Sequence, residues 1–404
     1  MAALVFAAAG RTVPLSSESL IADASLAGAG ADRVGWTRAN MPLLQGLRDE
    51  FAAGRPLAGR RLGMCLHVEP KTAVLVEVLL AGGCELALTG SPATTDDGTA
   101  ALLATWPGVT VWASNADDVA AHRRHIARVL DWAPDLLLDN GAELIGGASR
   151  RAQPVTAATE ETTSGANRLK GELSGGVPFP VVVIDDSPLK RLIENTYGVG
   201  PTVVEGFMRA TNLLVAATAF CVVGYGACGR GVARALRADG AAVLVVERDP
   251  VRALEAAFDG MRVMGLDAAL ARADVVVSVT GSTGVIGARE LGLVRDGVLL
   301  ANAGHFSELD VAALGPGRRL ADHVTEHDVG GKRVRLLGRG EMLNLTAATG
   351  NQIQVMDLGF ALQAHSLRAL AADPSRFLAG PQPVPAEIDD VVARAMLAAL
   401  SASG

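Results

Sequence analysis

The sequence predicts an α/β protein built from two Rossmann-like, doubly wound domains and a short helical segment at its C-terminal end. Strand-like apolar runs alternate with helical patterns in two separate series, and a glycine-rich turn opens the second series. Half of the 404 residues are hydrophobic but only 4% are aromatic, so Ala, Val and Leu must build the cores. This length is typical of two or three domains.

The first series of apolar runs lies between Arg60 and Asp139. Its strand-like and helix-like stretches are, in order, Leu62–Leu66, Thr72–Leu80, Glu85–Thr89, His122–Trp132 and Asp135–Leu138. Their alternation predicts βαβ units in a parallel sheet. The polar stretch from Gly146 to Gly176 interrupts this rhythm, and we expect it to form a long functional loop.

The second series follows a strand-like run at Pro180–Ile184. It comprises the runs Ala219–Val223, Ala242–Val246, Val275–Val279 and Val298–Asn302. These runs predict a separate nucleotide-binding domain. We therefore expect a first α/β domain over residues 1–190, a Rossmann domain over 196–342, and a segment over 343–404 that packs back on the first domain.

Charge and composition argue against several kinds of partner. The formal net charge is −7, and no run of basic residues is long enough to follow a nucleic-acid backbone. The longest apolar stretch, residues 213–223, is about half of the roughly 20 residues that cross a bilayer. The four cysteines show neither a CxxC pair nor the spacing of a metal site. We expect a cytoplasmic protein without nucleic-acid, membrane or metal binding.

The turn at Gly224–Gly229 reads Gly-Tyr-Gly-Ala-Cys-Gly and lies between an apolar strand and a helical pattern. In this context a GxGxxG turn predicts a dinucleotide site. Gly224 permits the tight turn, Gly226 lets a pyrophosphate approach the backbone, and Gly229 allows the helix to pack closely on the strand. The phosphates are expected at the N-terminus of the following helix.

Glu247 ends the next strand, about 20 residues after the glycine turn. A carboxylate at this position accepts hydrogen bonds from the ribose hydroxyls and repels a 2′-phosphate, which favours NAD over NADP. The neighbouring Arg248 and Arg252 weaken that preference. The expected cofactor is NAD.

Outside this turn, several motifs occur in a fixed order along the chain. They are Leu66–Thr72, Leu138–Gly141, Glu160–Gly165, Asp186-Ser187, Lys190, Glu194-Asn195, Tyr197-Gly198 and Asn302–Phe306. With these motifs the chain resembles the S-adenosylhomocysteine hydrolase family over nearly its whole length, from Met41 to the helix after Pro385. The resemblance makes the first domain the substrate-binding one.

The resemblance implies an NAD-dependent redox elimination on a small nucleoside. In this family NAD oxidises the ribose 3′-hydroxyl to a ketone, the C4′ proton becomes acidic, and the group on C5′ leaves. Water then adds and the ketone is reduced again. The family also implies a homo-oligomer, a tetramer or a dimer, and the expected apolar face of the helix Val391–Leu400 agrees with this.

By resemblance, each motif residue receives a role. Lys190 serves the 3′-hydroxyl, since a desolvated lysine can lose its proton, and the two histidines flank the 5′ position. The implied catalytic residues are His67, Lys190, Glu194, Asn195 and His305. Those implied for substrate binding are Glu69, Lys71, Asn140, Glu161 and Asn351. Those implied for cofactor binding are Thr162, Thr163, Ser164, Gly224, Gly226, Gly229, Glu247, Asn302, Gly304 and Asn344.

The chain departs from the family pattern at several of these positions. At the two adenine-facing positions of its first motif, where the family has Thr and Glu, this chain has Glu69 and Lys71. At four later positions, where the family has Asp, Asp, His and Asn, this chain has Asn140, Glu194, Asn351 and Arg252. An asparagine cannot act as a base. The sequence also ends without the lysine- and tyrosine-bearing tail of the family, so we expect weaker cofactor retention.

The departures cluster around the positions expected to contact the nucleobase, C4′ and the leaving group. The residues expected to serve 3′-oxidation remain. This pattern favours a nucleoside 5′-dehydratase that releases a 4′,5′-unsaturated nucleoside. Hydrolysis of S-adenosylhomocysteine to adenosine and homocysteine is the first alternative. A non-catalytic homologue that binds NAD or a nucleoside is the second. A plain 2-hydroxyacid dehydrogenase would not explain the motif Glu160–Gly165 or Lys190.

Overall fold

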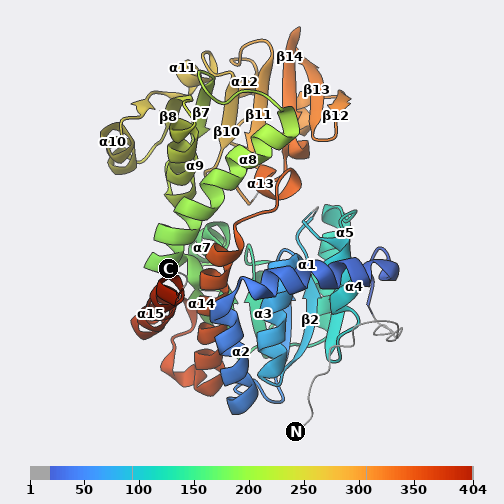
Figure 1. Cartoon of the computed structure of the whole chain (residues 1–404). Coiled ribbons are helices and arrows are strands. Elements are labelled where there is room, and N and C mark those ends of the chain that lie inside the picture. Colours follow the sequence, from blue (N-terminus) through green and yellow to red (C-terminus); the bar gives the residue numbers. More distant parts are fainter. Residues whose placement is uncertain (1–18, 93, 306, 403–404) are drawn as a thin grey trace.

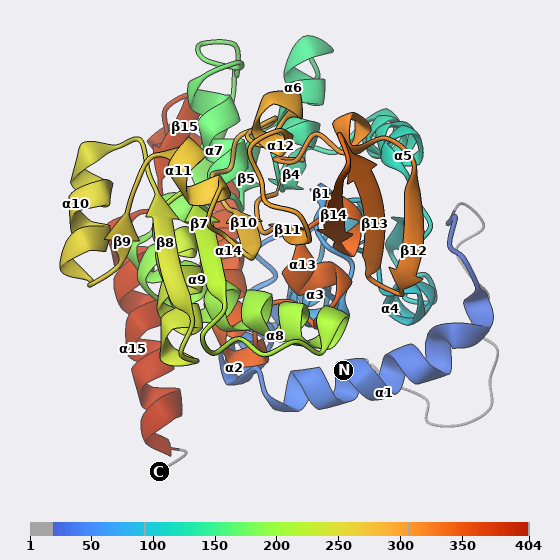
Figure 2. The same ribbon diagram turned by 90° about the horizontal axis from the view of Figure 1, so that it is seen from above.

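The computed structural model describes residues 19–402, apart from positions 93 and 306. It contains two mainly parallel sheets, each covered by helices, which lie one above the other in Figure 1. The prediction of two Rossmann-like α/β domains is confirmed. Figure 2 shows from above that the strands of the second domain lie over the first domain.

The first sheet has seven parallel strands in the order β15-β6-β5-β4-β1-β2-β3. Their bounds are β1 Arg61–Cys65, β2 Glu85–Thr89, β3 Val109–Trp112, β4 Leu136–Asp139, β5 Ala157–Glu160, β6 Pro180–Val183 and β15 Gly380–Pro383. Helices cover both faces, so the central strands read as continuous apolar runs. Strand β15 comes from the C-terminal segment and pairs with β6.

The helices of the first domain form two layers. One face of the sheet packs on helices from both ends of the chain, and Leu136 and Leu138 point into this core. Leu137 points to the other face, where α5, α6 and α7 pack, because side chains alternate along a strand. The bounds are α1 Ala27–Ala39, α2 Pro42–Gly54, α3 Pro70–Ala81, α4 Asp97–Leu103, α5 Val119–Asp131, α6 Glu143–Arg150 and α7 Thr163–Lys170.

The prediction of a long loop over residues 146–176 is wrong. This stretch contains the end of α6, the strand β5 and the helix α7. Strand β5 is only four residues long and reads Ala-Ala-Thr-Glu, so it lacks the apolar run that marks the other strands. It is nevertheless buried between β4 and β6.

The second sheet has eight strands in the order β12-β13-β14-β11-β10-β7-β8-β9. Their bounds are β7 Ala219–Val223, β8 Ala242–Val246, β9 Arg262–Val263, β10 Val275–Ser278, β11 Val298–Asn302, β12 Gly317–Ala321, β13 Val324–Val329 and β14 Lys332–Leu337. Strands β12 and β13 add an antiparallel edge that the apolar runs did not indicate. The helices here are α8 Val199–Thr211, α9 Ala227–Ala238, α10 Pro250–Phe258, α11 Leu266–Leu270 and α12 Ala288–Leu291.

A π-helical turn, η3 (Lys190–Gly198), leads directly into α8 and joins the two domains. Glycines let α8 and α9 pack closely, since a Cβ on Gly200 would lie 2.3 Å from the carbonyl oxygen of Gly231. After α13 (Leu343–Thr346), the chain returns through α14 (Ile353–Ala372) and α15 (Ala386–Ala402). Helix α14 packs on α2, α3 and η3 (Figure 1).

Helix α15 leaves Val391, Leu397 and Leu400 largely exposed. A homo-oligomer that covers this face stays a prediction.

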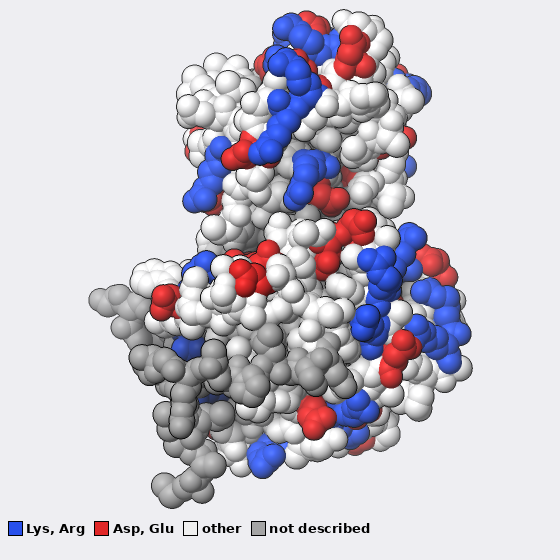
Figure 3. Space-filling model, turned by 90° about the vertical axis from the view of Figure 1, so that its right-hand side faces the viewer, with Lys and Arg blue, Asp and Glu red and all other residues white. Residues whose placement is uncertain are grey.

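Within residues 19–402, no helix combines the length and hydrophobicity that crossing a bilayer requires. Figure 3 shows that the surface is hollowed between the two domains, with acidic and basic side chains interspersed on both.

Candidate active site

One cavity lies where the carboxyl ends of the parallel strands of the two sheets face each other. Its lining includes residues within two positions of the ends of five different strands: His67, Asn140, Glu161, Gly224 and Glu247. Ligands of doubly wound sheets bind outside the carboxyl ends of the strands. The topology therefore gathers residues that are far apart in the sequence into one site.

The ammonium group of Lys190 is buried between two carboxylates in this cavity. It donates hydrogen bonds to Glu161 and, over 2.5 Å, to Glu194. Burial opposes the charge on Lys190, but the two carboxylates outweigh it and raise the pKa of this lysine. The expectation that desolvation frees Lys190 of its proton is thus wrong for the resting site, because its partners hold it as an ammonium.

Glu194 is a buried, titratable partner of Lys190. The π-helical turn η3 carries both residues, and Oε2 of Glu194 is buried without a hydrogen-bond partner among the described residues. Burial raises the pKa of Glu194 to about 7, although Lys190 lowers it. Near neutral pH, Glu194 is therefore balanced between accepting and releasing a proton.

His67 lines the same cavity and has one defined tautomer. The hydroxyl of Thr94 donates to the carbonyl oxygen of Ser91 over 2.9 Å, so its oxygen accepts from Nδ1 of His67, also at 2.9 Å. Nδ1 then carries the hydrogen, and Nε2 faces the amide of Asn140 at 3.3 Å. Burial lowers the pKa of His67 to about 3.

His305 approaches His67 from the second domain, with 6.1 Å between the ring centroids. A Cβ on Gly141 would lie 2.7 Å from Nε2 of His305, so a glycine is required for this approach. Burial, and secondly the nearby His122, lower the pKa of His305 to about 4. Both His67 and His305 are neutral imidazoles at neutral pH.

A buried carboxyl group holds the turn that carries Asn140. Glu160 accepts hydrogen bonds from the backbone N–H groups of Gly141 and Ala142, and also from Thr162. Burial raises the pKa of Glu160 to about 7, against these hydrogen bonds. Oδ1 of Asn140 is buried without a partner in the part of the chain that the structure describes. This oxygen is available to a bound molecule.

Glu69 and Lys71 form an ion pair beside the cavity, with 2.9 Å between Nζ of Lys71 and Oε2 of Glu69. Lys71 also donates to the carbonyl oxygens of Thr349, over 3.0 Å, and Asn351, over 2.7 Å. All three of its N–H groups are engaged, and Lys71 does not line the cavity, whereas Glu69 does. Burial raises the pKa of Glu69.

The glycine turn has the shape of a dinucleotide cradle. Gly224 has a φ of 102°, and a Cβ on Gly229 would lie 2.0 Å from the carbonyl oxygen of Gly224. A Cβ on Gly226 would meet only the end of the Arg252 side chain, 3.7 Å away. Glu247 is fixed by the backbone N–H of Tyr225, over 2.7 Å, and lines the cavity. These residues fit NAD.

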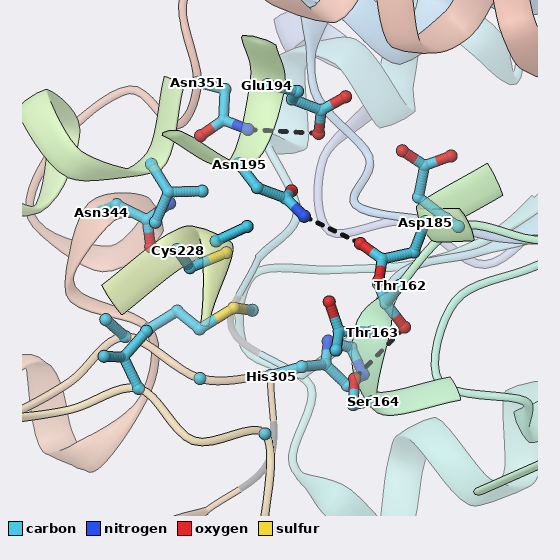
Figure 4. Close-up of a pocket in the computed structure, with 18 of the residues that line it drawn as sticks. Thr162, Thr163, Ser164, Asp185, Glu194, Asn195, Cys228, His305, Asn344 and Asn351 are labelled. Atoms are coloured by element: carbon cyan, nitrogen blue, oxygen red, sulfur yellow. Dashed lines mark hydrogen bonds between the residues drawn. The ribbon is translucent and has the colours of Figure 1, made fainter. Parts of the chain in front are cut away.

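Polar side chains from several elements line the cavity between the glycine turn and the Lys190 cluster, which consists of Lys190, Glu161 and Glu194 (Figure 4). Asn195 donates to Asp185 over 2.8 Å, and Asn351 donates to Glu194 over 3.3 Å. Oδ1 of Asn344 is buried without a partner among the described residues. The remaining predicted residues in this wall are Thr162, Thr163, Ser164 and Gly304.

Two predicted cofactor residues lie behind the cavity wall. Asn302 is fully buried and forms reciprocal hydrogen bonds with the backbone of Gly304, so it shapes the turn. Gly229 packs α9 on its strand and does not line the cavity. Phe306, which closes the last motif, lies outside the described residues.

Sequence reasoning missed several residues that hold the site together. They are Thr94, Glu160, Asp185, Glu308 and Gln363. Glu308 accepts from the backbone N–H groups of Thr280 and Gly281, and Gln363 donates to Glu161. Of these residues, only Glu160 lies in one of the family motifs. The helical pattern around Gln363 gives no signal for a polar contact. In the described chain, no group of three His, Cys, Asp or Glu residues is arranged to hold a metal ion.

Comparison with known proteins agrees with this geometry. The family model "S-adenosyl-L-homocysteine hydrolase" matches residues 18–153, and the model of its NAD-binding domain matches residues 195–350. The chain belongs to the S-adenosyl-L-homocysteine hydrolase family. It is therefore an NAD-dependent enzyme, and the resemblance inferred from the motifs is confirmed.

Relatives in this family match over most of their length. An S-inosyl-L-homocysteine hydrolase of Methanopyrus kandleri is 44% identical, covering 94% of this chain and 92% of the relative. An adenosylhomocysteinase of Archaeoglobus fulgidus is 40% identical, with 91% and 93% covered. An adenosylhomocysteinase of Thermosynechococcus vestitus is 38% identical, with 96% and 94% covered.

Replacing Lys190 tests its place in this hydrolase-family site. We expect Lys190→Arg to keep the charge between the two carboxylates but to abolish proton transfer, because a guanidinium does not lose its proton. Formation of NADH on mixing with a purine nucleoside should fall by roughly 100-fold or more. Lys170→Arg, at an exposed lysine paired with Asp186, is the matched control. Unchanged NADH formation in Lys190→Arg would exclude Lys190 as the proton-transfer group.

Glu194 should give the first redox step a pH dependence. Below its pKa of about 7, Glu194 is protonated and cannot accept a proton during the oxidation, so NADH formation should rise as pH increases through about 7. In Glu194→Gln this rise should disappear, whereas the exposed control Glu172→Gln should keep it. Stopped-flow absorbance of NADH across the pH range measures the effect. A rise retained in Glu194→Gln would assign it to another group.

Proposed function

We propose that this enzyme hydrolyses the thioether bond of an S-(purine nucleosid-5′-yl)-homocysteine by redox elimination. One observation carries the proposal. A buried ammonium and two carboxylates, Lys190 with Glu161 and Glu194, share one cavity with two neutral histidines and a dinucleotide cradle. The relatives named as S-inosyl-L-homocysteine hydrolase and adenosylhomocysteinase support a thioether of homocysteine as the substrate.

The Lys190 cluster suits the sugar end of the substrate. Bound NAD supplies the oxidising power that turns a ribose 3′-hydroxyl into a ketone and restores it at the end of the cycle. Glu161 offers carboxylate oxygens to the two ribose hydroxyls. Lys190 can receive the 3′-hydroxyl proton only after losing its own, which Glu161 and Glu194 oppose in the resting site. Binding of the ribose hydroxyls to Glu161 weakens this hold on the Lys190 proton.

The histidines suit the departure of a thiolate at C5′. A neutral imidazole is a weak acid, and both His67 and His305 are neutral at neutral pH. A thiolate needs less protonation to leave than a hydroxide does. Nε2 of His67 carries no hydrogen, so it can accept a proton from the water that adds to C5′. These properties favour thioether hydrolysis over dehydration.

The purine end of the cavity contains Glu69. Its carboxylate can accept a hydrogen bond from the amino group of adenine or from N1–H of hypoxanthine. Lys71 is fully engaged: it opposes the burial that raises the pKa of Glu69, and it anchors the loop at Thr349 and Asn351. Both purines therefore belong in the test.

Dehydration of a nucleoside at C5′ is the second candidate. Asn140 favours it, because the family's carboxylate is absent at this place and Oδ1 of Asn140 has no partner among the described residues. An amide there can bind a 5′-hydroxyl as readily as a thioether chain. The non-catalytic alternative is set aside, since the relatives that match most of the chain are named as enzymes.

Mass spectrometry and thiol titration separate these candidates. The protein is incubated with S-adenosylhomocysteine, S-inosylhomocysteine, adenosine and inosine, each in a separate reaction. Release of homocysteine with the free nucleoside, from either thioether, supports the proposal. A nucleoside product lighter by one water, without homocysteine release from either thioether, overturns the proposal in favour of dehydration.

A matched pair of variants links the products to the site. His67→Ala should retain NADH formation but lose most homocysteine release, because it acts at C5′ and not at the 3′-hydroxyl. His323→Ala, outside the cavity, should leave both activities unchanged. Loss of NADH formation in a folded His67→Ala protein would contradict the assignment of His67 to the 5′ end.

A further inference from the structure

Arg252 is a charged residue of the cavity wall to which the catalytic account gives no role. It lies in the first turn of α10 (Pro250–Phe258), which begins just after β8 and Glu247. The lining contains two cations among the described residues, Lys190 and Arg252. Lys190 is neutralised by Glu161 and Glu194, whereas Arg252 has only a long, exposed contact with Asp249.

The guanidinium of Arg252 points at the glycine turn. Its Nη1 lies 3.7 Å from the place where a Cβ on Gly226 would stand, and Gly226 is the N-cap of α9 (Ala227–Ala238). Gly226 lacks a side chain where the backbone must admit a pyrophosphate. Arg252 therefore borders the space that phosphates occupy at a helix N-terminus.

The nearest acid does not satisfy Arg252. Its Nε lies 3.6 Å from Asp249, beyond hydrogen-bond distance, and 55% of its side chain is exposed. Asp249 is itself committed as the N-cap of α10, where it accepts from the backbone N–H of Val251. The guanidinium is thus free to bind an anion without breaking a strong ion pair.

We propose that Arg252 binds a pyrophosphate oxygen of the dinucleotide and so determines how firmly this enzyme retains NAD. A guanidinium suits this role because it is always charged and can form two parallel hydrogen bonds to one phosphate. Glu247 stays beside it as an anion held by the backbone N–H groups of Tyr225, Arg248 and Asp249, and it still opposes a 2′-phosphate. The proposal concerns the cofactor and is independent of which thioether is cleaved.

Calorimetric titration of cofactor-stripped protein tests this role without any turnover. Arg252→Asn should weaken NAD and NADP by the same factor, roughly 10- to 100-fold, since both carry the pyrophosphate. Arg252→Lys should recover part of the loss. The affinity of the unaltered protein should fall more steeply with salt than that of Arg252→Asn. Arg248→Asn, an exposed neighbour outside the lining, is the matched control and should change neither affinity.

Three results would overturn the proposal. The first is an unchanged NAD affinity in Arg252→Asn. The second is a loss of affinity confined to NADP, which would place the guanidinium at the 2′ position. The third is an equal loss of NAD affinity in Arg248→Asn. Thermal melting without cofactor should be the same for all variants, because these side chains are largely exposed. NAD copurifying with the unaltered protein but lost from Arg252→Asn would give the same answer in a second measurement.

Discussion

The rest of the site depends on one buried ion cluster. The ammonium of Lys190 cannot be removed from water unless Glu161 and Glu194 compensate it, and two carboxylates cannot be buried together without that ammonium. The three residues come from η3 and from the end of β5, and Gln363 of α14 completes the hydrogen bonding of Glu161. The first domain, the connection to the second domain and helix α14 must therefore fold together for this cluster to form.

The arrangement of the two sheets places this ion cluster next to the other groups of the site. Their carboxyl ends face each other, so the Lys190 cluster meets the glycine turn on one side, while His67 and His305 approach from separate domains. Buried groups then take unusual protonation states, with a charged lysine, a glutamate near its pKa at neutral pH, and two neutral histidines. In the proposed reaction, that combination assigns the oxidation of the sugar and the elimination at C5′ to different groups.

Strong local patterns made most of the fold predictable from sequence. Runs such as Ala219–Val223 and Ala242–Val246 coincide with strands, because a parallel strand buried on both faces must be continuously apolar. Strand β5 escaped because Ala and Thr in a buried position leave no such run. Motif residues such as Lys190 were found, but their protonation was not, since it depends on Glu161, which is distant in sequence. Thr94 and Gln363 gave no signal for the same reason.

The central claim is that the Lys190 cluster drives oxidation at the 3′-position of a bound nucleoside. Oxidation there makes the C4′ hydrogen exchangeable, so exchange reports the ketone whatever group later leaves C5′. In heavy water, the NAD-loaded protein should place one deuterium at C4′ of a purine nucleoside, as detected by NMR, and Lys190→Arg should not. Absence of exchange with the unaltered protein, or equal exchange with Lys190→Arg, would contradict the account.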